Sequence, residues 1–224
     1  MSSASAINDI KADQIVAGIR EWVALETPPH DVKRLTEFSE LATHQAKQAG
    51  LTVDTIPVGD SKQPLVRIRA PSDNNEKSVL VLAHYDTVHP VGTVERNKLR
   101  IESDKMYGPG TYDMKAGGYL ALQAMAALFK EHQPARPVEL LLVPDEESGS
   151  RLSRENIEAL ARNAAFALVE ALAARSDATF VPMTVMIVPS VRGVRKEPLR
   201  HREGDGAARV AEPYWSSLST PCWL

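Results

Sequence analysis

The sequence predicts an α/β fold, with a mostly parallel sheet flanked by helices. Three short runs rich in apolar residues have the length of strands, at 79–83, 139–143 and 166–169. Strands that are apolar on both faces are typical of a sheet that helices cover on both sides. Predicted helices separate the runs, at 114–130 and 153–163, and this alternation of strand and helix favours parallel pairing.

Two amphipathic helices are predicted in the first fifty residues. The first has apolar residues at helical spacing and ends at Thr27-Pro28-Pro29; they are Ile15, Ile19, Trp22 and Val23. The second begins near Val32 and closes at Gly50, since glycine suits the left-handed position after a helix. Residues 65–69 then alternate like a strand, and 71–75 form a turn.

The later elements follow the first buried run. A polar loop with three glycines leads into the alanine- and leucine-rich helix at 114–130. Ser153 is expected to cap the helix that ends at Asn163, and one more strand is expected at 184–188. Tyr85 and His89 are expected to be loop residues.

The sequence changes character beyond about Glu170. Basic residues crowd together with proline and glycine between Arg192 and Arg209, without a usable period. We expect one folded region over 1–185 and an unpatterned, poorly ordered tail over 186–224. A basic arm for an acidic partner is the alternative.

Composition excludes several classes of protein. The 224 residues are 43% hydrophobic and 25% charged, which excludes collagen-like and wholly disordered chains. The net charge of −3 gives no reason to expect a nucleic acid or a membrane surface as a partner. Cys222 has no second cysteine to pair with, and no window approaches the roughly 18 apolar residues of a membrane helix. We therefore expect a cytoplasmic protein.

Metal-type ligands follow each of the three buried runs. His84 and Asp86 follow the first, Glu146 and Glu147 follow Asp145 after the second, and Glu170 follows the third. Sites in open α/β sheets form at the carboxyl ends of strands, so these side chains should converge. A further carboxylate, Asp113, lies between a glycine-containing loop and the start of a helix. One imidazole with several carboxylates suits zinc, manganese or cobalt.

Each of these groups alone is better explained as a polar loop. Adjacent carboxylates directly after a buried strand, such as Glu146 and Glu147, are harder to explain as an ordinary loop, because like charges repel unless a cation lies between them. Their shared position at strand ends is what favours a metal site.

Three ordered motifs carry a family resemblance: VLAHYDTVHPVG (81–92), YGPGTYDMKAGG (107–118) and LLVPDEESGS (141–150). They resemble the glutamate carboxypeptidase, aminoacylase and acetylornithine deacetylase family of two-metal zinc peptidases, with glutamate carboxypeptidase the most similar branch. The resemblance covers about residues 10–170. It implies a partial metallopeptidase catalytic domain over 1–185.

The resemblance implies a role for each motif residue. His84 would be a ligand of one metal, and Asp86 would hydrogen-bond its imidazole. Asp113 would bridge both metals, with a cis peptide bond after it. Glu147 would bind the second metal. Glu170 fits a further ligand, although the family has Glu-Pro there and this chain has Glu170-Ala171.

The implied reaction is hydrolysis of an amide bond at two divalent metal ions, zinc above all, with cobalt or manganese as alternatives. Glu146 would be the general base and would pass the proton to the leaving amine. The expected substrate is a small peptide cleaved at its C-terminal residue, or an N-acyl amino acid.

After Glu170 the sequence shows no counterpart of the family's lid domain or of its last histidine ligand. His201 matches neither the sequence around the lid histidine nor the sequence around that last ligand. We expect either a reading frame that shifts after Val169 or a short variant that recruits the missing groups. The competing function is therefore an inactive, truncated remnant with weak or no metal binding. Oligomeric state is left open.

Overall fold

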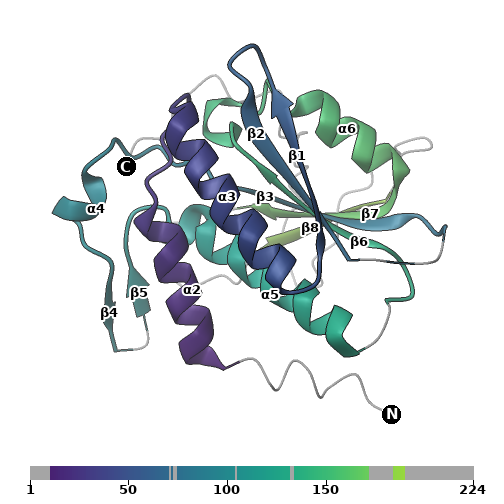
Figure 1. The fold of residues 1–224 in the computed structure, drawn as a ribbon, viewed down its shortest axis with the longest axis horizontal. Coiled ribbons are helices and arrows are strands. Elements are labelled where there is room, and N and C mark those ends of the chain that lie inside the picture. Colours follow the sequence, from purple (N-terminus) through teal and green to yellow (C-terminus); the bar gives the residue numbers. More distant parts are fainter. Residues whose placement is uncertain are drawn as a thin grey trace, which may run out of the picture. The chain divides into compact units, whose positions relative to one another are not determined.

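A six-stranded sheet lies at the centre of the computed structural model, which describes residues 11–70, 72, 75–103, 105–131, 134–171 and 184–189 (Figure 1). The strand order is β1-β2-β6-β3-β7-β8. The strands span Thr52–Val58 (β1), Gln63–Arg69 (β2), Ser78–His84 (β3), Val138–Val143 (β6), Ala164–Ala171 (β7) and Thr184–Pro189 (β8).

The sheet is mixed, which confirms the α/β class and corrects the expectation that most strands are parallel. At the centre, β3 pairs in parallel with β6 on one side and β7 on the other. The pairs β1–β2, β2–β6 and β7–β8 are antiparallel. Only residues 59–62 join β1 to β2, and a parallel pair would need a crossover of about a dozen residues. The sequence did not predict β1, an edge strand that contains Pro57 and is only partly buried.

Helices cover both faces of the sheet (Figure 1). One face carries α2 (Ala12–Ala24), α3 (Val32–Gln48) and α5 (Ala116–Glu131), and the other carries α6 (Arg154–Asn163). Within β6, Leu140 and Leu142 pack in the larger apolar cluster with the first three helices. Leu141 and Val143 pack in a second cluster with α6. The prediction of strands covered on both faces is thereby confirmed.

Several shorter elements lie between β3 and α6 in the chain, together with α5 and β6. They are α4 (Thr93–Arg96), the hairpin of β4 (Arg100–Glu102) and β5 (Lys105–Tyr107), the turn Thr111–Lys115 and the turn Glu146–Ser148. The predicted strand at 184–188 corresponds to β8, and the tail predicted over 186–224 lies outside the described residues from 190 onward. Within the described ranges, no helix has the length and apolar character needed to cross a membrane.

The helix end predicted at Gly50 is confirmed by its backbone. Gly50 has a φ of +81°, in the left-handed region that glycine adopts without strain. Its N–H donates to the carbonyl of Lys47, and the N–H of Leu51 donates to that of Ala46. This pair of bonds is a Schellman motif, which satisfies the last carbonyls of α3 and turns the chain into β1.

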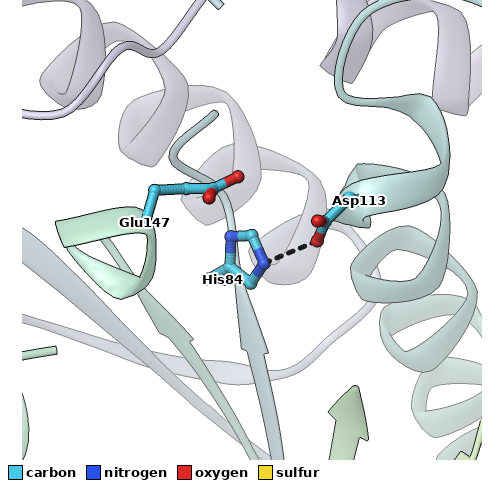
Figure 2. Close-up of side chains that lie close together, drawn as sticks. All are labelled: His84, Asp113 and Glu147. Atoms are coloured by element: carbon cyan, nitrogen blue, oxygen red, sulfur yellow. Dashed lines mark hydrogen bonds and ion pairs between the residues drawn. The ribbon is translucent and has the colours of Figure 1, made fainter. Parts of the chain in front are cut away.

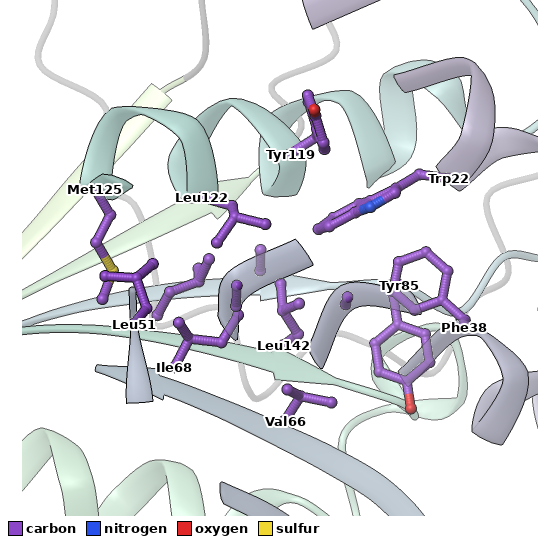
Figure 3. Close-up of a cluster of buried hydrophobic side chains, with 14 of the residues drawn as sticks. Trp22, Phe38, Leu51, Val66, Ile68, Tyr85, Tyr119, Leu122, Met125 and Leu142 are labelled. Atoms are coloured by element: carbon purple, nitrogen blue, oxygen red, sulfur yellow. The ribbon is translucent and has the colours of Figure 1, made fainter. Parts of the chain in front are cut away.

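Four aromatic side chains join the helices to the strand end that carries the first motif (Figure 3). Trp22 packs edge-on against Phe38 at 4.9 Å and against Tyr119 at 5.3 Å between ring centroids. Phe38 stacks on Tyr85 at 4.6 Å. Tyr85 lies in the loop directly after β3, as predicted, but it is fully buried and its hydroxyl donates to the carbonyl of Pro64. The aromatic packing fixes the chain directly after His84.

We predict that Gly18→Ala destabilises the protein, although alanine is the better helix former. Gly18 lies on the buried face of α2, and a Cβ there would come within 1.9 Å of Cζ of Tyr119. The ring is itself buried against Trp22, so relief requires repacking, at a cost of about 1–3 kcal/mol. The measurement is the free energy of unfolding in urea.

A double-mutant cycle supplies the control. In a Tyr119→Ala background the ring is gone, and Gly18→Ala should cost much less than in the wild type. An equal cost in both backgrounds would contradict the proposed clash.

Candidate metal centre and active site

Three side chains of metal-ligand type meet at the carboxyl end of the parallel strands (Figure 2). His84 is the last residue of β3, Glu147 lies in the turn after β6, and Asp113 lies just before α5. One ligand atom from each lies within 4.8 Å of the other two. The convergence arises because β3 and β6 are parallel neighbours whose carboxyl ends share an edge of the sheet.

His84 is held between two oxygens. Its Nε2 lies 2.9 Å from Oδ1 of Asp113, and its Nδ1 lies 3.1 Å from the backbone carbonyl of Asp86. Burial alone would lower the pKa of the imidazole, but the hydrogen bonds with Asp113 and Asp86 raise that pKa well above its ordinary value. With Nδ1 directed at the carbonyl, Nε2 is the nitrogen that faces the carboxylates.

Asp86 connects the ends of the two strands. Its fully buried carboxylate accepts the backbone N–H of Glu146 at 3.1 Å and that of Glu147 at 2.9 Å. The sequence predicted a hydrogen bond from Asp86 to the imidazole of His84. The structure places that contact at the backbone carbonyl, while Oδ1 lies 3.4 Å from Nδ1. Asp86 thereby orients the imidazole and both glutamates.

Asp145 faces into the protein and is not part of the three-residue group. It is almost fully buried, and its carboxylate accepts the N–H of Leu152 at 2.7 Å and the hydroxyl of Ser153. Ser153 does precede α6 as predicted, but its hydroxyl is used by Asp145 and makes no cap bond to the helix. Asp145 therefore closes the turn that presents Glu146 and Glu147.

A tight turn presents Asp113. Gly110 has a φ of +69°, and a Cβ there would meet Cγ2 of Thr87 at 2.6 Å, so only glycine fits. The peptide bond between Asp113 and Met114 is cis, as the family resemblance implied. The sulfur of Met114 accepts the backbone N–H of His84 at 3.4 Å, which joins the turn to β3.

Sequence reasoning missed Lys115, because a lysine beside a loop is normally exposed. Here it is buried, its Nζ donates to the carbonyl of Leu25, and it lies 5.1 Å from the ring centroid of Phe38. Burial lowers the pKa of Lys115 to about 7, against the opposing attraction of Asp86 and Glu26. Lys115 anchors the Asp113 turn to the end of α2.

The carboxylates of the site crowd one another. Burial, followed by the charge of Asp113, raises the pKa of Glu147 to about 7. Burial also raises the pKa of Glu146, whose Oε2 lies 3.7 Å from Nε2 of His84. Ionised carboxylates so close together are unfavourable without a positive partner, and a divalent cation supplies one. The donor set of one imidazole and two carboxylates therefore fits such a cation.

Glu170 is a residue of β7, paired with Val185 of β8. The position of its side chain lies outside what the structure describes, so its predicted role as a ligand stays a prediction. His201 lies outside the described residues.

A pocket of about 220 Å³ opens beside the three-residue group. Asp113 and Glu147 form part of its wall, and the rest is formed by Val88, His89, Gly108, Gly110 and Tyr112. We call it the site pocket. A substrate could reach the ligand-type side chains through this space.

Comparison with known proteins agrees with this geometry. The family model described as peptidase family M20/M25/M40 matches residues 80–191. Carboxypeptidase G2 from Pseudomonas sp. (strain RS-16) is 29% identical over 161 residues, which are 69% of this chain and 37% of that protein. The chain thus spans less than two-fifths of the length of this curated relative.

Solved structures share the fold. A metallo-carboxypeptidase from Sulfolobus solfataricus has a TM-score of 0.61 at 21% identity, over 71% of this chain and 38% of that one. A dipeptidase from Saccharomyces cerevisiae has a TM-score of 0.60 at 20% identity, with 76% and 41% covered. Human carnosine dipeptidase 1 has a TM-score of 0.59 at 19% identity, with 70% and 38% covered.

Asp86→Asn is predicted to weaken the binding of a divalent cation by about 10- to 100-fold. An amide offers one acceptor oxygen where the carboxylate has two, so one N–H of the Glu146–Glu147 pair loses its partner. Isothermal titration calorimetry with zinc measures the change in the dissociation constant. Asp60→Asn, in the exposed turn between β1 and β2, is the control. Equal affinities for Asp86→Asn and the wild type would contradict this account of Asp86.

Zinc affinity is predicted to fall as the pH drops from 8 to 6. Glu147 has a pKa of about 7 with no cation bound, so below that pH it carries a proton that must leave before it can bind zinc. The raised pKa of His84 acts in the same direction. Each such proton weakens the apparent affinity by up to about tenfold per pH unit.

Titrations at pH 6, 7 and 8 measure the slope. Glu147→Gln removes one titrating ligand, so it should bind zinc more weakly at pH 8 and with a shallower slope. Glu155→Gln, an exposed substitution on α6, should keep the wild-type slope. A zinc affinity independent of pH would contradict the assignment of these residues as ligands.

Proposed function

The chain belongs to peptidase family M20/M25/M40, and from this premise we propose that it hydrolyses the amide bond of a C-terminal amino acid or of an N-acyl amino acid. One observation carries the proposal. His84, Asp113 and Glu147 present ligand atoms within 4.8 Å of one another, with the carboxylate of Glu146 beside them.

The proposed metal ligands are His84, Asp113 and Glu147, with Glu170 as a further ligand. The proposed cofactor is a pair of divalent ions, with zinc first and cobalt or manganese as alternatives that suit the same donors. Such ions, when bound, polarise the scissile carbonyl and acidify a water molecule.

Glu146 is the proposed general base. Its side chain is 45% exposed, and its partial burial raises the pKa of its carboxyl group from the ordinary value, toward the range in which a group can both accept and return a proton. It takes the proton of the attacking water and delivers it to the leaving amine. Its backbone N–H is bound by Asp86, so the base is oriented by the same carboxylate that orients Glu147.

Asp86 and Asp113 divide the two sides of His84 between them. The carbonyl of Asp86 accepts a hydrogen bond from Nδ1, which leaves Nε2 facing the substrate side. Asp113 lies against Nε2, on the turn anchored by Lys115. In this arrangement the imidazole cannot rotate without breaking a bond on each side.

Substrate and setting are further parts of the proposal. Carboxypeptidase G2 and the dipeptidases with the same fold support a small peptide as substrate, and glutamate as the leaving residue is proposed from the motif resemblance. We propose a cytoplasmic setting and no nucleic acid or membrane partner, on the charge and composition of the chain. The competing hypothesis is a non-catalytic chain that binds metal weakly or not at all.

Glu146→Gln is predicted to lower kcat by at least about 100-fold while zinc binding is retained, because the amide cannot accept a proton. The assay is hydrolysis of N-acetyl-glutamate by the zinc-loaded chain, with zinc measured after dialysis. Chelation should abolish turnover, and added zinc should restore it. Glu155→Gln, on the exposed side of α6, is the matched control.

The two hypotheses give different results in this assay. Bound zinc and turnover that depends on Glu146 support the hydrolase. Zinc below one equivalent and no turnover by the wild type would overturn it in favour of the non-catalytic chain.

A further inference from the structure

Residues 88–91, which we call the 88–91 loop, are tied at both ends to the chain that directly follows α2. Before the loop, the backbone N–H of Thr87 donates to the carbonyl of Thr27 at 2.9 Å. After the loop, the backbone N–H of Gly92 donates to Oε2 of Glu26 at 2.7 Å. Two consecutive residues therefore fix where the loop begins and where it ends.

Glu26 holds its end of the loop through both carboxylate oxygens. Its Oε1 accepts the backbone N–H of Val94 at 2.8 Å, beside the bond from Gly92 to Oε2. Partial burial alone would raise the pKa of Glu26, but hydrogen bonds from the backbone of Gly92, Val94 and Thr93 lower that pKa overall. The carboxylate is therefore ionised at neutral pH, and charge-assisted hydrogen bonds of this kind are among the stronger ones in proteins.

The 88–91 loop carries His89 into the lining of the site pocket. Among the described residues that line this pocket, His89 is the one whose side chain can carry a positive charge. An imidazole donates an N–H to a carboxylate when it is neutral, and attracts the carboxylate more strongly when it is protonated. Both proposed kinds of substrate, a peptide cleaved at its C-terminal residue and an N-acyl amino acid, have a free carboxylate on the leaving residue. His89 is thus complementary to the group that they share.

We propose that His89 binds the free carboxylate of the leaving residue, and that Glu26 is the positioning residue that holds His89 at the site pocket. This inference rests on the proposed function and adds to it the recognition of the substrate. Glu26 acts through the backbone at Gly92 and the loop that precedes it. Substrate affinity therefore depends on Glu26 even though its carboxylate is engaged by Gly92 and Val94.

A second route leads from Glu26 toward the metal ligands. The charge of Glu26 attracts Lys115, which anchors the turn that presents Asp113. Zinc affinity distinguishes the two routes, because a change that travels through Lys115 and Asp113 alters a proposed ligand. A change that travels through the 88–91 loop leaves the ligands in place. We expect Glu26→Gln to bind zinc as the wild type does.

The first test compares N-acetyl-glutamate with its α-amide, in which the α-carboxylate is replaced by a carboxamide. Isothermal titration calorimetry into zinc-loaded Glu146→Gln measures the dissociation constants without turnover. His89→Ala should weaken binding of the acid about tenfold and that of the amide much less, since only the acid loses a charge-assisted hydrogen bond. His44→Ala removes an exposed histidine of α3 and should change neither value.

The second test is a double-mutant cycle in the same background. Glu26→Gln keeps the size of the side chain but offers one acceptor oxygen, so Gly92 or Val94 loses its partner. It should weaken binding of the acid severalfold when His89 is present and have little further effect in His89→Ala. A purely structural role for Glu26 would give the same loss in both backgrounds and for both ligands. Glu21→Gln, at an exposed position of α2, is the matched control.

These binding measurements separate the inference from the catalytic proposal. A loss confined to the acid in His89→Ala, non-additive effects of the two substitutions and unchanged zinc affinity support the inference. They do so even where the wild type hydrolyses neither compound, which would count against the hydrolase alone. Equal losses for acid and amide, additive effects, a fall in zinc affinity in Glu26→Gln, or binding of neither ligand overturns the inference.

Discussion

The carboxylate of Asp86 holds the site together, because it joins the ends of two strands that are far apart in sequence. It follows β3, yet both of its oxygens accept N–H groups from the turn after β6. Those N–H groups belong to Glu146 and Glu147, so one buried side chain orients the proposed base and a proposed ligand. The backbone of Asp86 meanwhile accepts from His84. A fully buried carboxylate is costly unless its oxygens are satisfied, and here the site itself satisfies them.

The packing of neighbouring residues holds the backbone at Asp86 in place. Tyr85 is locked between Phe38 and the carbonyl of Pro64, so the chain between His84 and Asp86 has little freedom to shift. Asp145 performs the matching task on the other strand by tying its turn to Ser153 at the start of α6. The helices on the two faces of the sheet thus brace the two halves of the site separately. Crowded acidic groups can persist in such a frame because relaxation by backbone movement is blocked.

Strand order explains which parts of the site could be read from sequence. His84 and Glu147 were predicted to meet because each follows a buried apolar run, and parallel neighbours bring such ends together. The sequence analysis placed Asp145 beside Glu147 in one cluster of metal-type ligands. Neighbouring positions in the sequence do not reveal that the Asp145 side chain faces inward and binds Ser153. The buried Lys115 was missed for a related reason: its partner, the carbonyl of Leu25, is a backbone group about which sequence pattern says nothing. The antiparallel β1–β2 pair was not predicted, because the few apolar residues of β1 are interrupted by polar residues and by Pro57 and were not recognised as a strand.

The turn from Gly110 to Lys115 presents Asp113 and also forms part of the wall of the site pocket. Asp113 faces His84 from this turn, and the preceding residue, Tyr112, lines the pocket beside it. Both ends of the turn are tied down, because Gly110 packs on Thr87 and Lys115 donates to the carbonyl of Leu25. A change in the backbone at Tyr112 would therefore shift Asp113 as well, whereas a change confined to the Tyr112 side chain would not.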